Sequence, residues 1–396
     1  MSDHPATIQI GMPVRNGAAF IDRALASVRR QRRTDWVLLV SDNGSTDDTP
    51  AVVARHLEDP RIRYLRQPGD LGALGNFGYL LGQATTPKFC WMAADDEWDE
   101  RFLEDGCAAL AAQPDRGTAF TGMVNVDAAG AEIRGYPFLP ALDAPPGRGA
   151  ATRCAAFLEY LGKANLIYGL HRTEACRFAW RGLERIETLR RRWQEPDGFL
   201  WGADMAFVLR LVAASGLAHS APVRFRKRIA DHRGGRLPDH LGHRSLPGGA
   251  PLGEYLFGLL LACWESTAFG DVCATLARRL AGEDPAGRLV GACPALEGAD
   301  LEVRSTRHEA LAPLLELAPG HWRLEWLAHL AATEAGDGAA SRHHLVRVLS
   351  SSPPARLAEA CQELLATAAE AVPPVAGRNH FRRTTTTPRG GAGSLP

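Results

Sequence analysis

Three short runs of apolar, strand-forming residues alternate with segments of helical periodicity in the first quarter of the chain. The runs are Ile8–Val14, Trp36–Val40 and Phe89–Met92. Between the first two, residues 20–28 place apolar side chains at the spacing of one helix face. Continuous apolar strands that alternate with helices are typical of a parallel sheet covered by helices on both faces. The sequence therefore predicts an α/β fold.

Each of the three runs ends in a group of polar or turn-forming residues. Pro13–Gly17 closes the first run, Ser41–Thr49 follows the second, and Asp95 and Asp96 follow the third. The carboxyl ends of parallel strands lie along one rim of the sheet, and ligands of such sheets bind beyond that rim. We therefore expect these groups to lie together at a binding site.

The acids Asp95, Asp96, Glu97 and Asp99 allow two interpretations. Adjacent carboxylates repel each other, and Mg²⁺ or Mn²⁺ arriving with a phosphate ligand would relieve that repulsion, since such ions use one or two protein carboxylates plus substrate phosphates. The same acids would also suit the first turn of a helix that begins near Glu100. This stretch alone does not decide between a metal site and a helix cap.

Asp42 and Asn43 carry groups that pair with the edge of a base or with ribose hydroxyls. Their alternative role is a simple turn followed by a helix cap. The stretch Asp70–Asn76 places glycines before a helix, where the backbone can approach a ligand closely. It is not the GxGxxG fingerprint, and no GxxxxGK[ST] occurs in the chain. These patterns argue against dehydrogenases and P-loop NTPases.

Composition narrows the class of protein further. The 396 residues have a formal net charge of zero, so no broad footprint for nucleic acid is expected. The eight cysteines are dispersed without CxxC spacing, which argues against zinc and for reduced thiols. We expect no signal peptide at the N-terminus, and no transmembrane segment, because Leu256–Trp264 is too short to span a bilayer. The expected location is the cytoplasm, or the inner face of a membrane.

Four motifs together resemble the family 2 glycosyltransferases. They are Ile10–Gly17 with Ser27 and Gln31, then Leu38–Asp47, then Leu71-Gly72 with Asn76, and last Ala94–Trp98. The resemblance covers residues 7 to about 105. It implies a GT-A fold, that is, a Rossmann-like α/β/α sheet of nucleotide-diphospho-sugar transferases. It also implies a UDP-, GDP- or dTDP-linked sugar donor, a divalent Mn²⁺ or Mg²⁺ ion, and inverting transfer to a hydroxyl acceptor such as a glycan, lipid, protein or small molecule.

The resemblance also assigns residues to the donor site. The implied nucleotide-binding residues are Pro13, Val14, Arg15, Asn16, Asp42, Asn43, Gly72, Asn76 and Asp95. The implied metal site is Asp95 with Asp96. The family often has a further acid two positions before Asp95, where this chain has Ala93. We therefore expect Asp96 to bind the metal and Asp95 to contact ribose or metal-bound water.

Two later segments resemble parts of the family that surround sugar and acceptor. Asn165–Arg172 resembles the segment near the sugar, with Tyr168, Gly169 and Arg172 as its candidates, although an edge strand fits equally. Arg224–Gly235 is a basic segment that resembles a loop folding over the diphosphate, with the alternative of a solvated strand. Its candidates are Arg228, Arg233 and His232, the last as a third metal ligand.

Asp204 stands at the start of a helical pattern. A helix cap is one interpretation. The family resemblance implies that it is the general base, which inversion requires to deprotonate the acceptor hydroxyl as it attacks opposite the diphosphate. Asp197, on the preceding loop, is the substitute candidate.

The predicted organisation is a GT-A domain at 1–245, with a nucleotide half at about 7–105 and an acceptor half at about 106–245. A helical domain at 246–372 follows, which would serve acceptor binding or contact with a second copy or another protein. Residues 373–396 are too poor in apolar groups to pack, so a disordered tail is predicted. Alternative functions are a nucleotidyltransferase, or a non-catalytic nucleotide-sugar binding module in which Ala93 marks lost metal chemistry.

Overall fold

The computed structural model describes residues 5–135, 150–159, 163–192, 203–229, 250–266, 269–280 and 306–370. The predicted site residues Asp197, His232 and Arg233 lie outside these ranges, as does the predicted tail 373–396.

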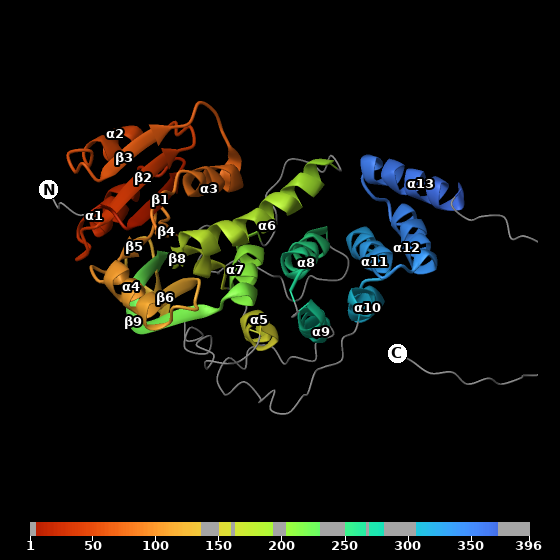
Figure 1. Ribbon diagram of the computed structural model, residues 1–396. Coiled ribbons are helices and arrows are strands. Elements are labelled where there is room, and N and C mark those ends of the chain that lie inside the picture. The colour runs from red at the N-terminus through yellow and green to blue at the C-terminus, as the bar shows by residue number, and fades with distance from the viewer. Residues whose placement is uncertain are drawn as a thin grey trace, which may run out of the picture.

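A nine-stranded mixed sheet forms the core of the N-terminal part (Figure 1). Its strands are β1 (Ile8–Val14), β2 (Trp36–Asp42), β3 (Ile62–Arg66), β4 (Lys88–Trp91), β5 (Glu97–Trp98), β6 (Thr118–Val126), β7 (Glu132–Gly135), β8 (Leu170–Arg172) and β9 (Leu217–Arg228). The order is β3-β2-β1-β4-β8-β6-β9-β5, with β7 beside β6. The first four strands are parallel, as predicted. The pairings β4–β8, β6–β8, β6–β7 and β5–β9 are antiparallel. A hairpin turn at Asp127–Gly130 after the Thr118–Asn125 strand is also a prediction of the sequence, and the β6–β7 pair agrees with it.

Helices cover both faces of this sheet. The helices are α1 (Ile21–Arg29), α2 (Thr49–Ala54), α3 (Gly72–Gly82), α4 (Phe102–Ala112), α6 (Thr173–Arg192) and α7 (Ala203–Ala214). Helices α1, α2 and α4 pack on one face, and α3, α6 and α7 lie on the other. The connection after β3, which contains α3, crosses to the other face of the sheet, and β4 then pairs with β1 on the side away from β2. The direction of the strand order therefore reverses between β1 and β4. Ligands of open α/β sheets bind at the carboxyl ends of the strands beside such a reversal.

A group of helices continues from the sheet toward the C-terminus (Figure 1). They are α5 (Ala150–Glu159), α8 (Ala250–Cys263), α9 (Phe269–Leu280), α10 (Arg307–Leu317), α11 (Trp322–Glu334), α12 (Gly338–Ser350) and α13 (Ala355–Glu370). Helix α8 packs on α6 and α7, and α9 packs on α5, so these helices share one apolar core with the sheet part. The domain boundary near residue 245 stays a prediction. No helix in the described part of the chain has the length and apolar character needed to cross a membrane.

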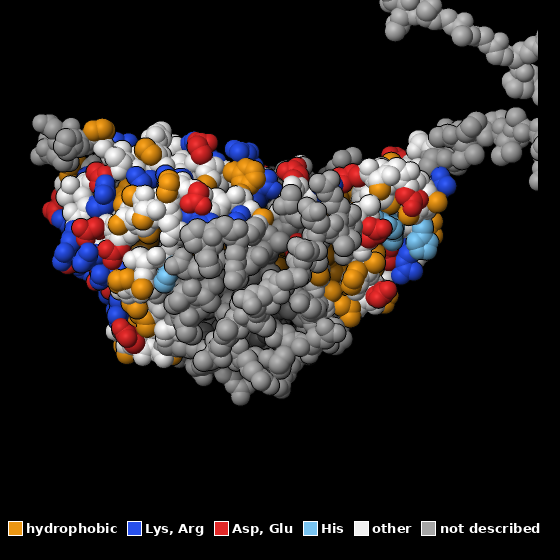
Figure 2. Space-filling model, turned by 60° about the horizontal axis from the view of Figure 1, so that its bottom comes forward, with side chains coloured by type: hydrophobic (Ala, Val, Ile, Leu, Met, Phe, Trp, Pro, Cys, Tyr) orange, Lys and Arg blue, Asp and Glu red, His pale blue; other side chains and the backbone are white. Residues whose placement is uncertain are grey.

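Acidic and basic side chains are interspersed on the surface of the sheet part in the face that Figure 2 shows. Exposed side chains of the sheet part also form ion pairs between neighbouring helices and loops. Arg29 lies 3.0 Å from Glu58, and Arg55 lies 3.5 Å from Asp22. Because these pairs are exposed, each contributes little to stability.

The helical part contains a buried carboxylate that supports a first prediction. Glu325 on α11 is 1% exposed, His344 Nδ1 lies 2.7 Å from its Oε2, and Arg347 Nε lies 2.5 Å from its Oε1. Burial opposes ionisation, but these hydrogen bonds outweigh it and hold the pKa of Glu325 below its ordinary value of 4.5. A lowered pKa means that the stabilisation is present above pH 4.5 and is lost as the pH falls through the lowered value.

Glu325→Gln is therefore expected to lower the free energy of unfolding by about 2 kcal/mol at neutral pH, and to flatten its dependence on pH in acid. Urea unfolding followed by circular dichroism between pH 7 and pH 3 measures both effects. The control is Glu359→Gln on α13, whose pair with Arg356 is exposed on both sides. That control should change stability by less than about half a kcal/mol. Equal losses in the two variants would contradict the prediction.

Candidate functional site

The loops after β1 and β2 interlock at the rim. Asn43 N donates to Val14 O (2.8 Å), Asn16 N donates to Ser45 Oγ (2.9 Å), and Thr46 N donates to Asn16 Oδ1 (2.8 Å). Asn16 has a φ of 54°, a left-handed conformation that asparagine tolerates better than most residues. The two loops therefore form one rigid surface.

The loop after β4 lies against the same surface. A Cβ on Gly17 would stand 2.6 Å from Val14 Cγ2, so the position favours glycine. The same Cβ would stand 3.6 Å from Ala94 Cβ, which is ordinary contact distance and places the β1 loop beside the segment that carries the acids. The side chain of Arg228 lies over the Phe20 ring, with 5.4 Å between Cζ and the ring centroid. The predicted meeting of the three polar groups at one rim agrees with these contacts.

The carboxylate of Asp42 accepts hydrogen bonds from within the protein. It is 0% exposed, its Oδ1 accepts a hydrogen bond from Ser45 N (2.7 Å), and its Oδ2 accepts one from the Tyr64 hydroxyl (2.6 Å). Burial and the bond to Asp42 raise the pKa of Tyr64 to about 12, so the hydroxyl stays protonated and donates. Asp42 thus holds the turn after β2 in shape.

Asn43 and Asn76 are also engaged in internal bonds. Asn43 Nδ2 donates to Asp70 Oδ1 (2.6 Å), and its Oδ1 accepts from Leu71 N (2.8 Å). Asn76 Nδ2 donates to Ser41 O (3.0 Å), and its Oδ1 accepts from Ser41 Oγ (2.5 Å). These two amides join the loops after β2 and β3 to α3.

An exposed ion pair stands above this network. Arg15 and Asp70 bond to each other, and their side chains are 54% and 44% exposed. Asn16 and Thr46, which join the loops after β1 and β2, are exposed at this part of the rim as well.

Asp96 does not present its carboxylate at the surface. The residue is 0% exposed, its Oδ2 lies 3.0 Å from Lys227 Nζ, and its Oδ1 accepts a hydrogen bond from Arg228 N (2.8 Å). Burial raises the pKa of Asp96 to about 6, although the attraction of Lys227 opposes this. Both oxygens are bound to β9, so this arrangement does not favour the metal role that the sequence suggested for Asp96.

Asp95 is the more open acid. It is half-buried, and no hydrogen bond or ion pair of its carboxylate occurs within the described part of the chain. Its carbonyl oxygen accepts a hydrogen bond from Arg228 Nε (3.1 Å), and the same guanidinium binds Glu97 Oε1 (2.7 Å). Arg228 also donates to Asp127 O and Ala128 O, so this candidate for donor binding is committed to holding the loop.

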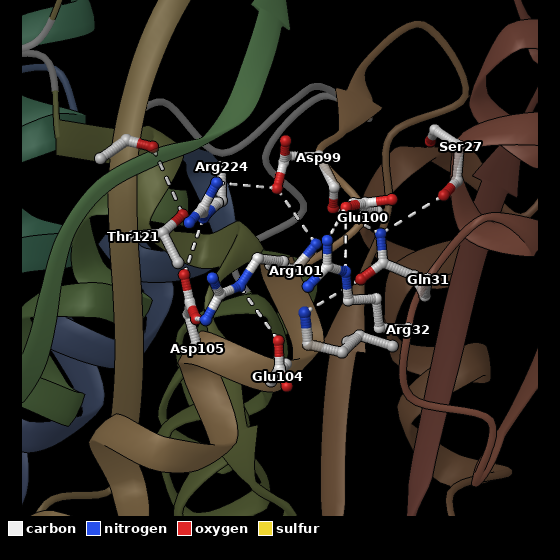
Figure 3. Close-up of polar contacts among 12 residues, drawn as sticks. Ser27, Gln31, Arg32, Asp99, Glu100, Arg101, Glu104, Asp105, Thr121 and Arg224 are labelled. Atoms are coloured by element: carbon white, nitrogen blue, oxygen red, sulfur yellow. Dashed lines mark hydrogen bonds and ion pairs between the residues drawn. The ribbon is translucent and has the colours of Figure 1, made fainter.

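The far side of the acid segment is anchored by polar contacts (Figure 3). Arg224 NH1 lies 3.0 Å from Asp99 Oδ1, and Arg224 Nε lies 2.7 Å from Asp105 Oδ2. Gln31 Nε2 donates to Asp99 O (2.7 Å), and Ser27 Oγ accepts from Trp98 N (3.2 Å). Two residues of the first motif therefore act by fixing the acid segment to α1.

Tyr168 links Lys227 and the acids Asp95 and Asp96 to the start of α7. Lys227 Nζ stands 4.8 Å from the centroid of its ring. Burial raises the pKa of Tyr168 to about 12; Lys227 opposes this rise, and Asp96, Asp95 and Asp204 add to it. Asp204 lies in the first turn of α7, and its Oδ1 accepts a hydrogen bond from Met205 N (2.8 Å). Asp204 at the start of α7 and the acids Asp95 and Asp96 are therefore all within electrostatic reach of the Tyr168 hydroxyl.

Two other candidates of this region have packing roles. Arg172 donates to Arg116 O and Leu110 O, both at 2.9 Å, and so ties β8 to the end of α4. A Cβ on Gly169 would come within 2.7 to 2.9 Å of Phe120, Thr118 and Ala119, so the position requires glycine for close packing.

Sequence reasoning missed Lys227 and Tyr64 as parts of the site. A signal for Lys227 exists, because Phe225 is buried and side chains two apart on a strand share a face. Its partner Asp96 lies 131 residues away, and no local pattern reports such a pairing.

The side chains available as metal ligands limit how a metal ion can bind at this rim. Among the described residues there is no group of three or more His, Cys, Asp or Glu side chains able to hold one. Asp95 offers one carboxylate at the rim. That fits a Mg²⁺ or Mn²⁺ ion that arrives with substrate phosphates, and does not fit an ion held by the protein alone.

Two curated relatives match part of this chain. A validoxylamine A glucosyltransferase of Streptomyces hygroscopicus subsp. jinggangensis is 38% identical over 73 residues, which are 18% of this chain and 17% of that protein. A GalNAc(5)-diNAcBac-PP-undecaprenol beta-1,3-glucosyltransferase of Campylobacter jejuni is 33% identical over 92 residues, 23% of this chain and 30% of that protein. The matches span less than a third of either relative.

Solved structures extend the likeness beyond this segment. The crystal structure of S. aureus TarS 1-349 in complex with UDP-GlcNAc matches with a TM-score of 0.51 and 14% identity, over 87% of this chain and 91% of that one. At such identity the likeness concerns the fold alone, and it confirms the GT-A fold. Residues 9–144 match the sequence model described as Glycosyl transferase family 2. The chain therefore carries, over residues 9–144, a domain of glycosyl transferase family 2.

Proposed function

We propose that the protein is an inverting, metal-assisted glycosyltransferase that moves a sugar from a nucleotide-diphosphate donor to a hydroxyl acceptor. One observation carries the proposal: an open carboxylate, Asp95, and an aspartate at a helix start, Asp204, both lie within electrostatic reach of Tyr168 in a chain that carries a family 2 match. Such a pair of acids provides both an electrostatic site for a leaving group and a base for an attacking hydroxyl.

The donor would lie across the loops after β1, β2 and β4. The exposed pair Arg15–Asp70 is the polar surface there for the nucleoside, together with the backbone of Pro13–Asn16 and Gly72. Asp95 would share a divalent cation with the diphosphate, and that cation would supply charge stabilisation as the diphosphate leaves. Val14, Asp42, Asn43 and Asn76 would shape this surface from beneath.

Asp204 would act as the base. An acid in the first turn of a helix is favoured as the carboxylate by the helix dipole. It would accept the proton of the acceptor hydroxyl while the oxygen attacks the face of the sugar opposite the diphosphate. His232 as a third metal ligand and Arg233 as a cation for the diphosphate remain proposals, since both residues lie outside the described ranges.

The acceptor and the role of helices α8 to α13 are further parts of the proposal. The helices would contact the acceptor or a second copy of the chain. UDP-linked sugars are the first donors to test, because the TarS structure contains UDP-GlcNAc; GDP- and dTDP-linked sugars follow.

A thermal-shift screen of nucleoside diphosphates and nucleotide sugars, with and without Mn²⁺, tests the proposal. We expect at least one nucleotide to raise the melting temperature more with Mn²⁺ than without it, because a ligand that binds only the folded state stabilises it. Slow hydrolysis of the matching donor should then release nucleoside diphosphate. Release of pyrophosphate would identify a nucleotidyltransferase instead, and binding without turnover against any acceptor would identify a non-catalytic binding module.

A further inference from the structure

We propose that Lys227 is a built-in counter-ion that makes cation binding at this rim depend on the nucleotide. By neutralising Asp96, it leaves one carboxylate for a divalent ion, so the ion binds firmly only when a diphosphate supplies the remaining oxygens. This inference rests on the proposed function and assigns a role to Lys227, which is not among the candidates named for the basic segment Arg224–Gly235.

The contacts place Lys227 inside the acid cluster. Its Nζ lies 3.0 Å from Asp96 Oδ2 and 4.8 Å from the centroid of the Tyr168 ring, and its side chain is 19% exposed. The following residue, Arg228, binds the other Asp96 oxygen through its backbone N–H. Strand β9 thus delivers both partners of the Asp96 carboxylate.

Two of the three carboxylates in the acid segment have a cationic partner. The acid segment carries Asp95, Asp96 and Glu97, which are three negative charges in a row. Lys227 pairs with Asp96 at 3.0 Å, and Arg228 pairs with Glu97 at 2.7 Å. One negative charge, at Asp95, is left without a paired cation among the described residues.

A single carboxylate is a poor site for a free hard cation, which takes six or more oxygen ligands. A diphosphate alone would meet the negative charge of Asp95 and be repelled. When both bind, the diphosphate supplies the oxygen ligands that the cation lacks. The cation in turn removes the repulsion between the diphosphate and Asp95. By linkage, the nucleotide then increases the affinity for the cation by the same factor as the cation increases the affinity for the nucleotide.

Removing the Lys227 ammonium would break this dependence. With Lys227→Ala, the Asp96 carboxylate would lose its counter-ion and gain access to the space that the lysine side chain filled. Asp95 and Asp96 would then form a two-carboxylate site that holds a cation without nucleotide. Lys227→Arg keeps the positive charge and should preserve the natural behaviour.

The experiment is a titration of Mn²⁺ into the full chain at pH 8, followed by the electron paramagnetic resonance signal of free Mn²⁺, with and without UDP or GDP. The wild type should bind Mn²⁺ weakly alone and at least about tenfold more tightly with the nucleotide. Lys227→Ala should bind Mn²⁺ alone at least about tenfold more tightly than the wild type. Lys227→Ala combined with Asp96→Asn should return to the wild-type pattern, because the second carboxylate charge is gone.

Lys88→Ala is the matched control, since Lys88 begins β4 at the end of the strand remote from Asp95. It should leave Mn²⁺ binding unchanged. Unchanged Mn²⁺ binding by folded Lys227→Ala would overturn the inference, and so would equal gains in Lys227→Ala and its double variant. Failure of every nucleotide to affect Mn²⁺ binding by the wild type would instead overturn the proposed function. Circular dichroism of each variant confirms that it is folded.

Discussion

Asp204→Asn is expected to lower the rate of sugar transfer by about 10²-fold or more while leaving the affinity for the donor nucleotide nearly unchanged. The amide keeps the shape of the side chain but cannot accept the acceptor proton, and loss of a general base costs this order of rate. Steady-state transfer assays give the rate, and titration calorimetry with the nucleotide and Mn²⁺ gives the affinity.

Glu174→Gln is the matched control, because Glu174 is also an acid in the first turn of a helix, α6, and its pair with Arg177 is exposed. It should retain full activity. Transfer by Asp204→Asn at the wild-type rate would remove Asp204 from the mechanism. A parallel loss of nucleotide affinity would show that Asp204 shapes the donor site rather than acting on the acceptor.

Asp95→Asn and Asp96→Asn are expected to fail in different ways. Asp95→Asn should keep the stability of the wild type but abolish the Mn²⁺-dependent tightening of nucleotide binding, and lower transfer by about 10²-fold or more, because a cation at the leaving group contributes several kcal/mol. Asp96→Asn should lower the free energy of unfolding by about 3 kcal/mol, since it leaves the Lys227 ammonium without its partner in a mostly buried site.

Urea unfolding and nucleotide titrations with and without Mn²⁺ separate the two outcomes. Combining Asp96→Asn with Lys227→Met should recover much of the lost stability, because a neutral pair of similar shape replaces the ion pair. Loss of Mn²⁺ dependence in Asp96→Asn, with Asp95→Asn unaffected, would restore the original assignment of Asp96 as the metal ligand.

The side chains of Asp42, Asn43 and Asn76 are bound within the protein, so we propose that these motif residues support the donor site from beneath. The polar atoms of each of these side chains form hydrogen bonds with the backbone or side chains of neighbouring segments. A rigid rim loses less conformational freedom when a ligand binds, so we expect these bonds to preorganise the proposed donor site.

Local patterns in the sequence determined the parallel strands β1 to β4, the helices between them and the position of the polar groups at one rim. Runs of apolar residues and helical spacing are properties of neighbouring residues, so a single sequence reports them. The family motifs extended this to the GT-A fold, because they are also short and local.

Tertiary structure alone decided which carboxylate stays open. Asp95 and Asp96 are adjacent and chemically alike, and they differ because Lys227 and the backbone of Arg228 arrive on β9 from more than 130 residues away. The same holds for Arg172 and Arg228, whose guanidinium groups bind backbone carbonyls that folding brings within reach. The energy of a charge depends on the partners and solvent around it, and the fold sets both.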